Sequence, residues 1–182
     1  FNPEVMWEAQ TALTQAEQPG SKGIEVIDDL ESGTVRSLVS YGHYPRWSPD
    51  GRHIAFVKSV YFFRNPWNEH IHIVPAAGGD PQYLCHGVLL GWSQDSKHIY
   101  YYRAQDQCVY KRPFDDPNAT AERILYSPTY FPSISPDESR IAYQHRGQLI
   151  VKDLATLDTV VTWQLPILPL YYHASWRVPQ RP

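Results

Sequence analysis

Two histidines and an arginine stand where side chains from distant parts of the chain could act on one ligand. His43 and His173 each come a few residues before a tryptophan of a repeated pattern, and Arg46 comes directly before Trp47. Imidazoles bind metal ions and exchange protons near neutral pH, and a guanidinium binds carboxylates or phosphates. Two histidines are too few ligands for a metal centre, and the corresponding positions in the other repeats are apolar or aromatic. We therefore expect no metal and no catalytic residue.

Aromatic residues gather in the segments around these histidines. A long stretch over residues 61–67 adds further aromatics and an arginine beyond what a hairpin needs. Such clusters are typical of protein interfaces, because they bury a large area at a small cost in entropy. The alternative is that they pack over or between the sheets. The candidate binding residues are His43, Tyr44, Arg46, Tyr61, Phe62, Phe63, Arg64, Trp67, Tyr130, Tyr172 and His173.

The remaining residues that resemble a catalytic motif belong to a repeated turn. Residues 91–95 (GWSQD) begin like the GxSxG elbow of hydrolases but lack its final glycine, so we interpret Ser93 as a turn residue. Asp50, Asp95 and Asp137 recur once in each repeat. Such recurrence indicates structural caps, whereas a catalytic acid is normally unique to one copy. His70 and His72 share one face of an expected strand, where we expect them to be solvated.

These turns lie in a repeat that is detectable by eye. Its copies are YPRWSPDGRHIAFV at 44–57, LLGWSQDSKHIYYY at 89–102 and FPSISPDESRIAYQ at 131–144. Trp47, Trp92 and Ile134 occupy one column, 45 and then 42 residues apart, and Trp176 follows after another 42. The period of a four-stranded propeller blade is about 40 to 45 residues. Each copy predicts a strand, a Ser-Pro-Asp-Gly turn and a second strand.

The repeat predicts an all-β propeller of four four-stranded blades. Residues 173–178 are expected to form the innermost strand of a blade whose other strands come from residues 4–39. The other blades are expected over 44–85, 89–126 and 131–164. Closure of the ring by the C-terminal strand would remove exposed sheet edges. An eight-bladed ring of two chains and a fragment of a larger propeller remain alternatives; we favour the closed monomer.

The WSPDG turn followed by an IAF-type strand resembles the TolB-like β-propeller family, a group of WSPDG repeats similar to WD repeats. WSPDGRHIAFV and SPDESRIAY match its pattern closely, and GWSQDSKHIYYY matches with substitutions. The resemblance covers almost the whole chain. It implies a propeller that binds partner proteins in the bacterial periplasm or another extracytoplasmic location. It extends to peptidase propellers and to polysaccharide lyases that hold a metal with channel histidines.

The composition narrows the classes of partner. The chain has 182 residues, 16 scattered Lys and Arg and a net charge of -3, which argues against nucleic acid. No apolar run approaches the roughly 20 residues of a membrane span. Cys85 and Cys108 cannot build a disulfide framework, and we expect two buried free thiols.

We therefore expect a non-enzymatic scaffold whose loop-rich face binds a protein or peptide, with no cofactor. The alternative is an enzyme or binder acting at the channel mouth on an oligosaccharide or small ligand, with or without a metal. It would use His43, His173, Tyr130 and Arg46.

Overall fold

A computed structural model describes residues 24–29, 33–59, 69–127, 132–165 and 176. The regular secondary structure of these residues is entirely β-strand. No helix long and apolar enough to cross a membrane occurs in this part of the chain. The all-β class expected from the repeat is confirmed.

The strands form four antiparallel sheets, three of four strands and one of two, each built from strands that are consecutive in the chain. The two-stranded sheet pairs β1 (Ile24–Asp29) with β2 (Thr34–Val39). The four-stranded sheets are β3 (His43–Trp47), β4 (His53–Ser59), β5 (Glu69–Pro75) and β6 (Gln82–His86); β7 (Val88–Trp92), β8 (His98–Arg103), β9 (Cys108–Pro113) and β10 (Glu122–Tyr126); and β11 (Ser133–Ile134), β12 (Arg140–His145), β13 (Gln148–Asp153) and β14 (Thr159–Gln164).

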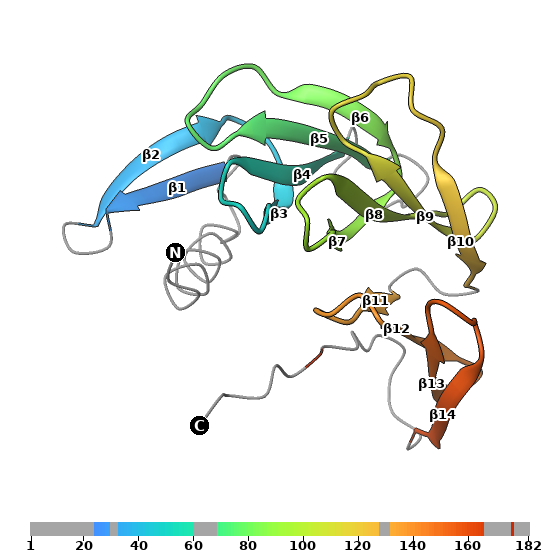
Figure 1. Cartoon of the computed structure of the whole chain (residues 1–182). Helices are drawn as coiled ribbons and strands as arrows, with labels where there is room; N and C mark the ends of the chain where they lie inside the picture. The colour runs from blue at the N-terminus through green and yellow to red at the C-terminus, as the bar shows by residue number, and fades with distance from the viewer. Residues whose placement is uncertain (1–23, 30–32, 60–68, 128–131, 166–175, 177–182) are drawn as a thin grey trace.

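Figure 1 shows the sheets following one another along an arc, from β1–β2 at one end to β11–β14 at the other. The further strands expected beside β1–β2, from residues 4–23 and 173–178, lie outside the described residues apart from Trp176. One residue, Gly87, joins β6 to β7. Its φ is 145°, and a Cβ there would lie 2.7 Å from the carbonyl oxygen of Tyr102. The tight step between these sheets therefore requires glycine.

Each sheet packs its face on the next sheet, and an apolar cluster fills each junction. Ile24, Phe56 and Val74 join β1–β2 to the β3–β6 sheet. The largest cluster lies between the β3–β6 and β7–β10 sheets and includes Ile71 and Ile99, both fully buried. The third cluster joins β7–β10 to β11–β14, and its buried residues are Val88, Tyr102, Ala104, Val109, Leu125, Ile141 and Tyr143. Alternation along the strands supplies both faces of a sheet with apolar side chains.

The repeated turn has the same hydrogen bonds in every copy. Ser93 is buried; its Oγ donates to Asp95 Oδ1 at 2.5 Å and accepts from the backbone N–H of His98 at 2.9 Å. The matching serine-to-aspartate distances are 2.6 Å for Ser48 with Asp50 and for Ser135 with Asp137. The interpretation of these aspartates and of Ser93 as structural turn residues is confirmed.

Candidate interaction face

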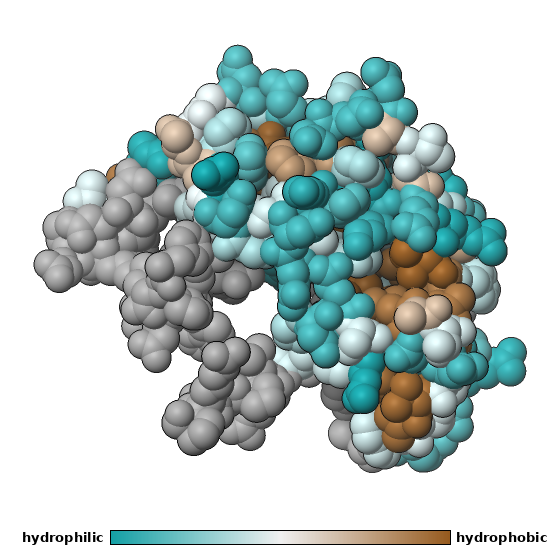
Figure 2. All heavy atoms as spheres, in the orientation of Figure 1, coloured by the Kyte–Doolittle hydropathy of each residue, from teal (hydrophilic) through white to brown (hydrophobic). Residues whose placement is uncertain are grey.

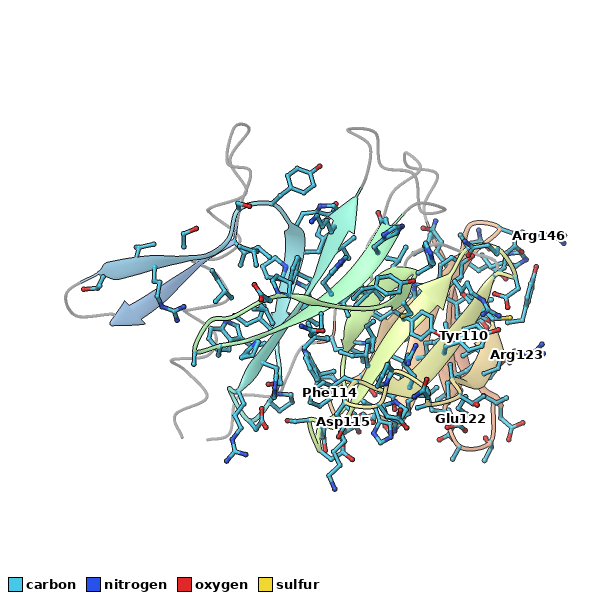
Figure 3. All side chains as sticks on the ribbon, turned by 90° about the horizontal axis from the view of Figure 1, so that it is seen from above. Tyr110, Phe114, Asp115, Glu122, Arg123 and Arg146 are labelled. Atoms are coloured by element: carbon cyan, nitrogen blue, oxygen red, sulfur yellow. The ribbon has the colours of Figure 1, made fainter. Side chains whose placement is uncertain are left out.

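The connections between strands lie at two opposite ends of the sheets. We call the end formed by residues 48–52, 76–81, 93–97, 114–121, 135–139 and 154–158 the turn face. The opposite end, which includes residues 43, 58–59, 69–70, 86–88, 104–107 and 145–148, is the loop face. The corresponding turns of neighbouring sheets lie side by side, since the backbone N–H of Asp50 donates to Ser96 Oγ at 3.0 Å. These two sheets therefore have the same orientation. Figure 3 shows Arg146 of the loop face and Asp115 of the turn face at opposite ends of the strands.

Three of the predicted binding residues are described, and all lie on β3. The rings of His43 and Tyr44 meet edge to face at 4.9 Å. Tyr44 has a φ of 53° and packs partly buried against the largest core cluster. Arg46 Nη1 donates to the carbonyl of Pro45 at 3.0 Å, and the Arg46 carbonyl accepts from Trp92 Nε1 at 2.9 Å. β3 is thus tied to the following sheet by the packing of Tyr44 and by the hydrogen bond to the Arg46 carbonyl.

The other predicted binding residues lie outside the described residues. They are Tyr61, Phe62, Phe63, Arg64, Trp67, Tyr130, Tyr172 and His173. The convergence of His43 and His173, on which the metal alternative depended, therefore stays a prediction.

Sequence reasoning missed a histidine–tyrosine cluster on β5 and β6. His70 and His86 are cross-strand partners whose rings lie 4.3 Å apart, edge to face. The Tyr83 ring lies 5.7 Å from both His72 and His86, and its residue is 51% exposed. His70 and His72 are partly buried in this cluster. The expectation of solvated histidines is corrected, because their neighbours across the strands cover them.

A register shift between β5 and β6 creates this arrangement. Ile71 pairs with Cys85, yet His72 pairs with Tyr83, so Leu84 is an extra residue on β6. Leu84 and Cys85 both lie in the largest core cluster, which leaves Tyr83 and His86 beside the histidines. A β-bulge of this kind redirects side chains. The alternation of residue types in the sequence cannot reveal it.

The histidines of the cluster resist protonation. Burial lowers the pKa of His70, and nearby His86 and His72 lower it further. Burial also lowers the pKa of His72, and the positive charge of Lys58 lowers this pKa further. The carbonyl of His70, which lies 3.2 Å from His72 Nδ1, raises it. Both imidazoles are therefore mainly neutral at neutral pH.

A second polar cluster on the loop face is internally neutral. Asp106 Oδ2 accepts from Arg103 at 2.5 Å and from Tyr110 Oη at 2.5 Å. The Arg103 guanidinium also lies over the Tyr110 ring at 4.2 Å. The hydrogen bond from Arg103 is the largest cause that lowers the pKa of Asp106. This carboxylate is therefore already paired.

The described residues contain no group of three or more His, Cys, Asp or Glu side chains that could hold a metal ion. Cys85 and Cys108 are buried free thiols, and burial raises the pKa of Cys85 to about 11. A thiol with so high a pKa is a poor nucleophile. The arrangement offers an aromatic and imidazole-rich surface for contact.

The sequential four-stranded antiparallel sheets, stacked face to face along an arc, are those of a β-propeller. The fold is TolB-like: TolB from Acinetobacter baumannii matches over 75% of this chain and 36% of its own, with a TM-score of 0.55 and 19% identity. A nidogen/laminin complex matches over 80% and 56%, with a TM-score of 0.58 and 14% identity. A luciferin-regenerating enzyme matches over 83% and 61%, with a TM-score of 0.56 and 14% identity.

At these identities the similarity concerns the fold alone. The chain spans from about a third to three fifths of the length of these structures. Comparison with protein-family models finds no match, and comparison with curated protein sequences finds none either.

Proposed function

We propose that the protein is a non-enzymatic β-propeller scaffold that binds a protein partner on its loop face. The observation that carries the proposal is the cluster of His70, His72, Tyr83 and His86, whose rings contact one another on β5 and β6. The cluster reaches the loop face at His70 and His86, and it continues along the two strands to His72 and Tyr83. Partly exposed aromatic groups held rigidly by a sheet bind with little loss of conformational entropy. Structures with the same fold include one member of a nidogen/laminin complex, so the fold serves in protein assemblies.

Partner capture by variants of the loop face tests this proposal. Replacing the aromatic residues of 61–67 by serine, or Tyr83 by serine, should abolish capture of a partner while leaving the circular dichroism spectrum unchanged. The control is Leu157→Asn on the turn face, where a residue 40% exposed has a φ of 62° that asparagine accepts. Equal capture by all variants would refute the assignment of the binding function to the loop face.

A second candidate is a small-ligand or oligosaccharide enzyme at the channel mouth. It is supported by the fold shared with a luciferin-regenerating enzyme and by the position of His43 and Arg46 on the first strand of their sheet. Thermal-shift screening with oligosaccharides discriminates between the two. A stabilisation that His43→Ala removes would favour the enzyme over the scaffold.

We also propose that the ring closes through residues 173–178. Trp92 Nε1 donates to the carbonyl of Arg46, and Trp176 Nε1 donates to that of Ser133 at 3.2 Å. Each acceptor directly precedes the residue of the tryptophan column in the preceding sheet. Trp176 therefore occupies the position expected for the first strand of a sheet that follows β11–β14.

Trp47 supports the same proposal from the other end of the arc. Its indole Nε1 is buried and has no hydrogen-bond acceptor among the described residues. Trp92 and Trp176 each donate to the carbonyl directly before the tryptophan-column residue of the preceding sheet. In the same pattern, Trp47 would donate to the carbonyl of residue 175, directly before Trp176. A buried N–H without a partner costs about 1 to 3 kcal/mol, which favours closure.

The free face of the last sheet also requires a neighbour. Val151 pairs with Val161, and Leu149 pairs with Trp163, on the face of β11–β14 that points away from β7–β10. Trp163 is 53% exposed, whereas Ile71 and Ile73 on the corresponding face of β3–β6 are buried. In Figure 2 apolar atoms gather beside β10, where the β7–β10 and β11–β14 sheets meet. A following blade would cover Trp163 and its neighbours on the opposite face in the same way.

A further inference from the structure

Charged side chains are distributed unevenly between the two faces of the molecule. Among the described residues, the turn face carries eight carboxylates and two cationic side chains, Arg52 and Lys97. The carboxylates belong to Asp50, Asp80, Asp95, Asp115, Asp116, Asp137, Glu138 and Asp158. Figure 3 shows Asp115 and Glu122 together at this end, far from Arg146.

The loop face has the opposite balance. Its carboxylates among the described residues are Glu69, which is buried, and Asp106, which is paired with Arg103. Lys58 at the end of β4 and Arg146 in the β12–β13 turn are both exposed, and neither forms an ion pair within the described part of the chain. The net charge of -3 therefore conceals a loop face on which cations outnumber available anions.

His70 makes the charge of the loop face dependent on pH. It lies at the start of β5, at the loop-face end of this strand. The titratable and charged groups that face His70 are Lys58 on β4, His72 on its own strand and Tyr83 and His86 on β6. None of these neighbours is a carboxylate. Protonation of His70 therefore increases the electrostatic repulsion between His70 and these groups until an anion binds.

We propose that the loop face binds a carboxylate-rich, acidic segment of a partner protein, held by Lys58, Arg146 and the histidines of the His70–His86 cluster. This inference rests on the proposed scaffold function and names the chemistry of its partner. The carboxylates would lie over Lys58 and the protonated imidazole of His70, with Tyr83 as an apolar and hydrogen-bonding neighbour. Because a bound carboxylate favours the protonated imidazole, affinity increases as the pH falls and decreases as salt screens the charges.

The test measures anisotropy of a rhodamine-labelled oligo-glutamate peptide, with oligo-glutamine as the control peptide. The variant Lys58→Glu/Arg146→Asp reverses charge on the loop face, and aspartate accepts the φ of 48° at position 146. The matched control, Arg52→Glu/Lys97→Glu, makes the same change in net charge on the turn face, where both residues are exposed. We expect about tenfold weaker binding for the first variant and little change for the second.

Lowering the pH from about 8 to about 5.5 should strengthen peptide binding severalfold in the native chain, and less in His70→Gln. Equal loss in the two charge-reversal variants would show a response to net charge only and overturn the proposal. Self-association at low salt, detected by light scattering and abolished by Lys58→Glu/Arg146→Asp, would identify the acidic turn face of a second copy as the occupant and also overturn it. A partner that binds the loop face while oligo-glutamate does not would refute the acidic partner and leave the scaffold function standing.

Discussion

At the scale of single residues, one serine and one aspartate close each repeated turn. The Ser93 hydroxyl links the aspartate to the start of the following strand, and the backbone N–H of Lys97 donates to the same carboxylate oxygen at 2.9 Å. The hydrogen bond from Ser93 and that from Lys97 hold the pKa of Asp95 at about 2. The carboxylate therefore stays ionised, as an acceptor of several donors must.

Ser93→Ala should destabilise the protein by about 1 to 2 kcal/mol, because it removes a buried hydroxyl and leaves the backbone N–H of His98 without its side-chain acceptor. The pKa of Asp95 should rise towards its ordinary value. Urea unfolding and carboxyl NMR titration measure the two effects. Gln105→Ala, at an exposed position of the opposite end, is the control. An unchanged pKa with lower stability would contradict the linkage between the two residues.

The sequence predicts the role of a residue best when the contacts of that residue lie close to it along the chain. The Ser48, Ser93 and Ser135 turns were predictable, because the hydrogen bonds that close each turn lie within five residues along the chain. The pairing of His70 with His86 was not, because it depends on the bulge at Leu84 and on the exact register of β6. The predicted aromatic site shares this limit, since long loops carry no repeat to fix their positions.

At the scale of elements, the left-handed residue of the repeated turn joins neighbouring sheets. Gly51, Ser96 and Glu138 all have positive φ there, between 56° and 70°. From the sequence, Ser96 and Glu138 are poorer turn residues than glycine. The structure gives a reason for them: Ser96 Oγ accepts from Asp50, and Glu138 accepts from Gln94 and from Tyr100 Oη, the latter at 2.6 Å. Deviations from the turn pattern therefore hold the sheets together.

Glu138→Gly should destabilise the protein by about 1 to 2 kcal/mol even though glycine suits the φ of the turn. Relief of the left-handed backbone contributes about 1 kcal/mol, but the lost charged hydrogen bonds from Tyr100 and Gln94 cost more. Leu157→Gly is the matched control, because Leu157 also has a left-handed φ but an exposed side chain. Thermal unfolding should show a lower Tm for Glu138→Gly alone. A rise in Tm in both variants would show that backbone strain outweighs the inter-sheet contact.

At the scale of the whole molecule, the fold class and the strands of each repeat follow from the sequence. The period of the Trp47 column and its turn signals suffice for the three four-stranded sheets. No local pattern determines how the ends of the arc are covered, because this depends on contacts between the first and last parts of the chain. The unsatisfied indole of Trp47 and the exposed Trp163 mark the two ends that the proposed closure would join.

Removal of the proposed closing strand provides a test at this scale. A chain ending after Leu165 lacks residues 173–178, whereas one ending after Val178 keeps them. The shorter chain should unfold at a lower temperature and associate as its concentration rises, because the apolar face that carries Leu149 and Trp163 stays uncovered. The longer chain should behave as the full chain does, with the mass of one chain by light scattering. Twice that mass would identify a ring of two chains. Equal stability of the two truncated forms would rule out closure by this strand, because the hydrogen bond from Trp176 to Ser133 would then contribute nothing measurable.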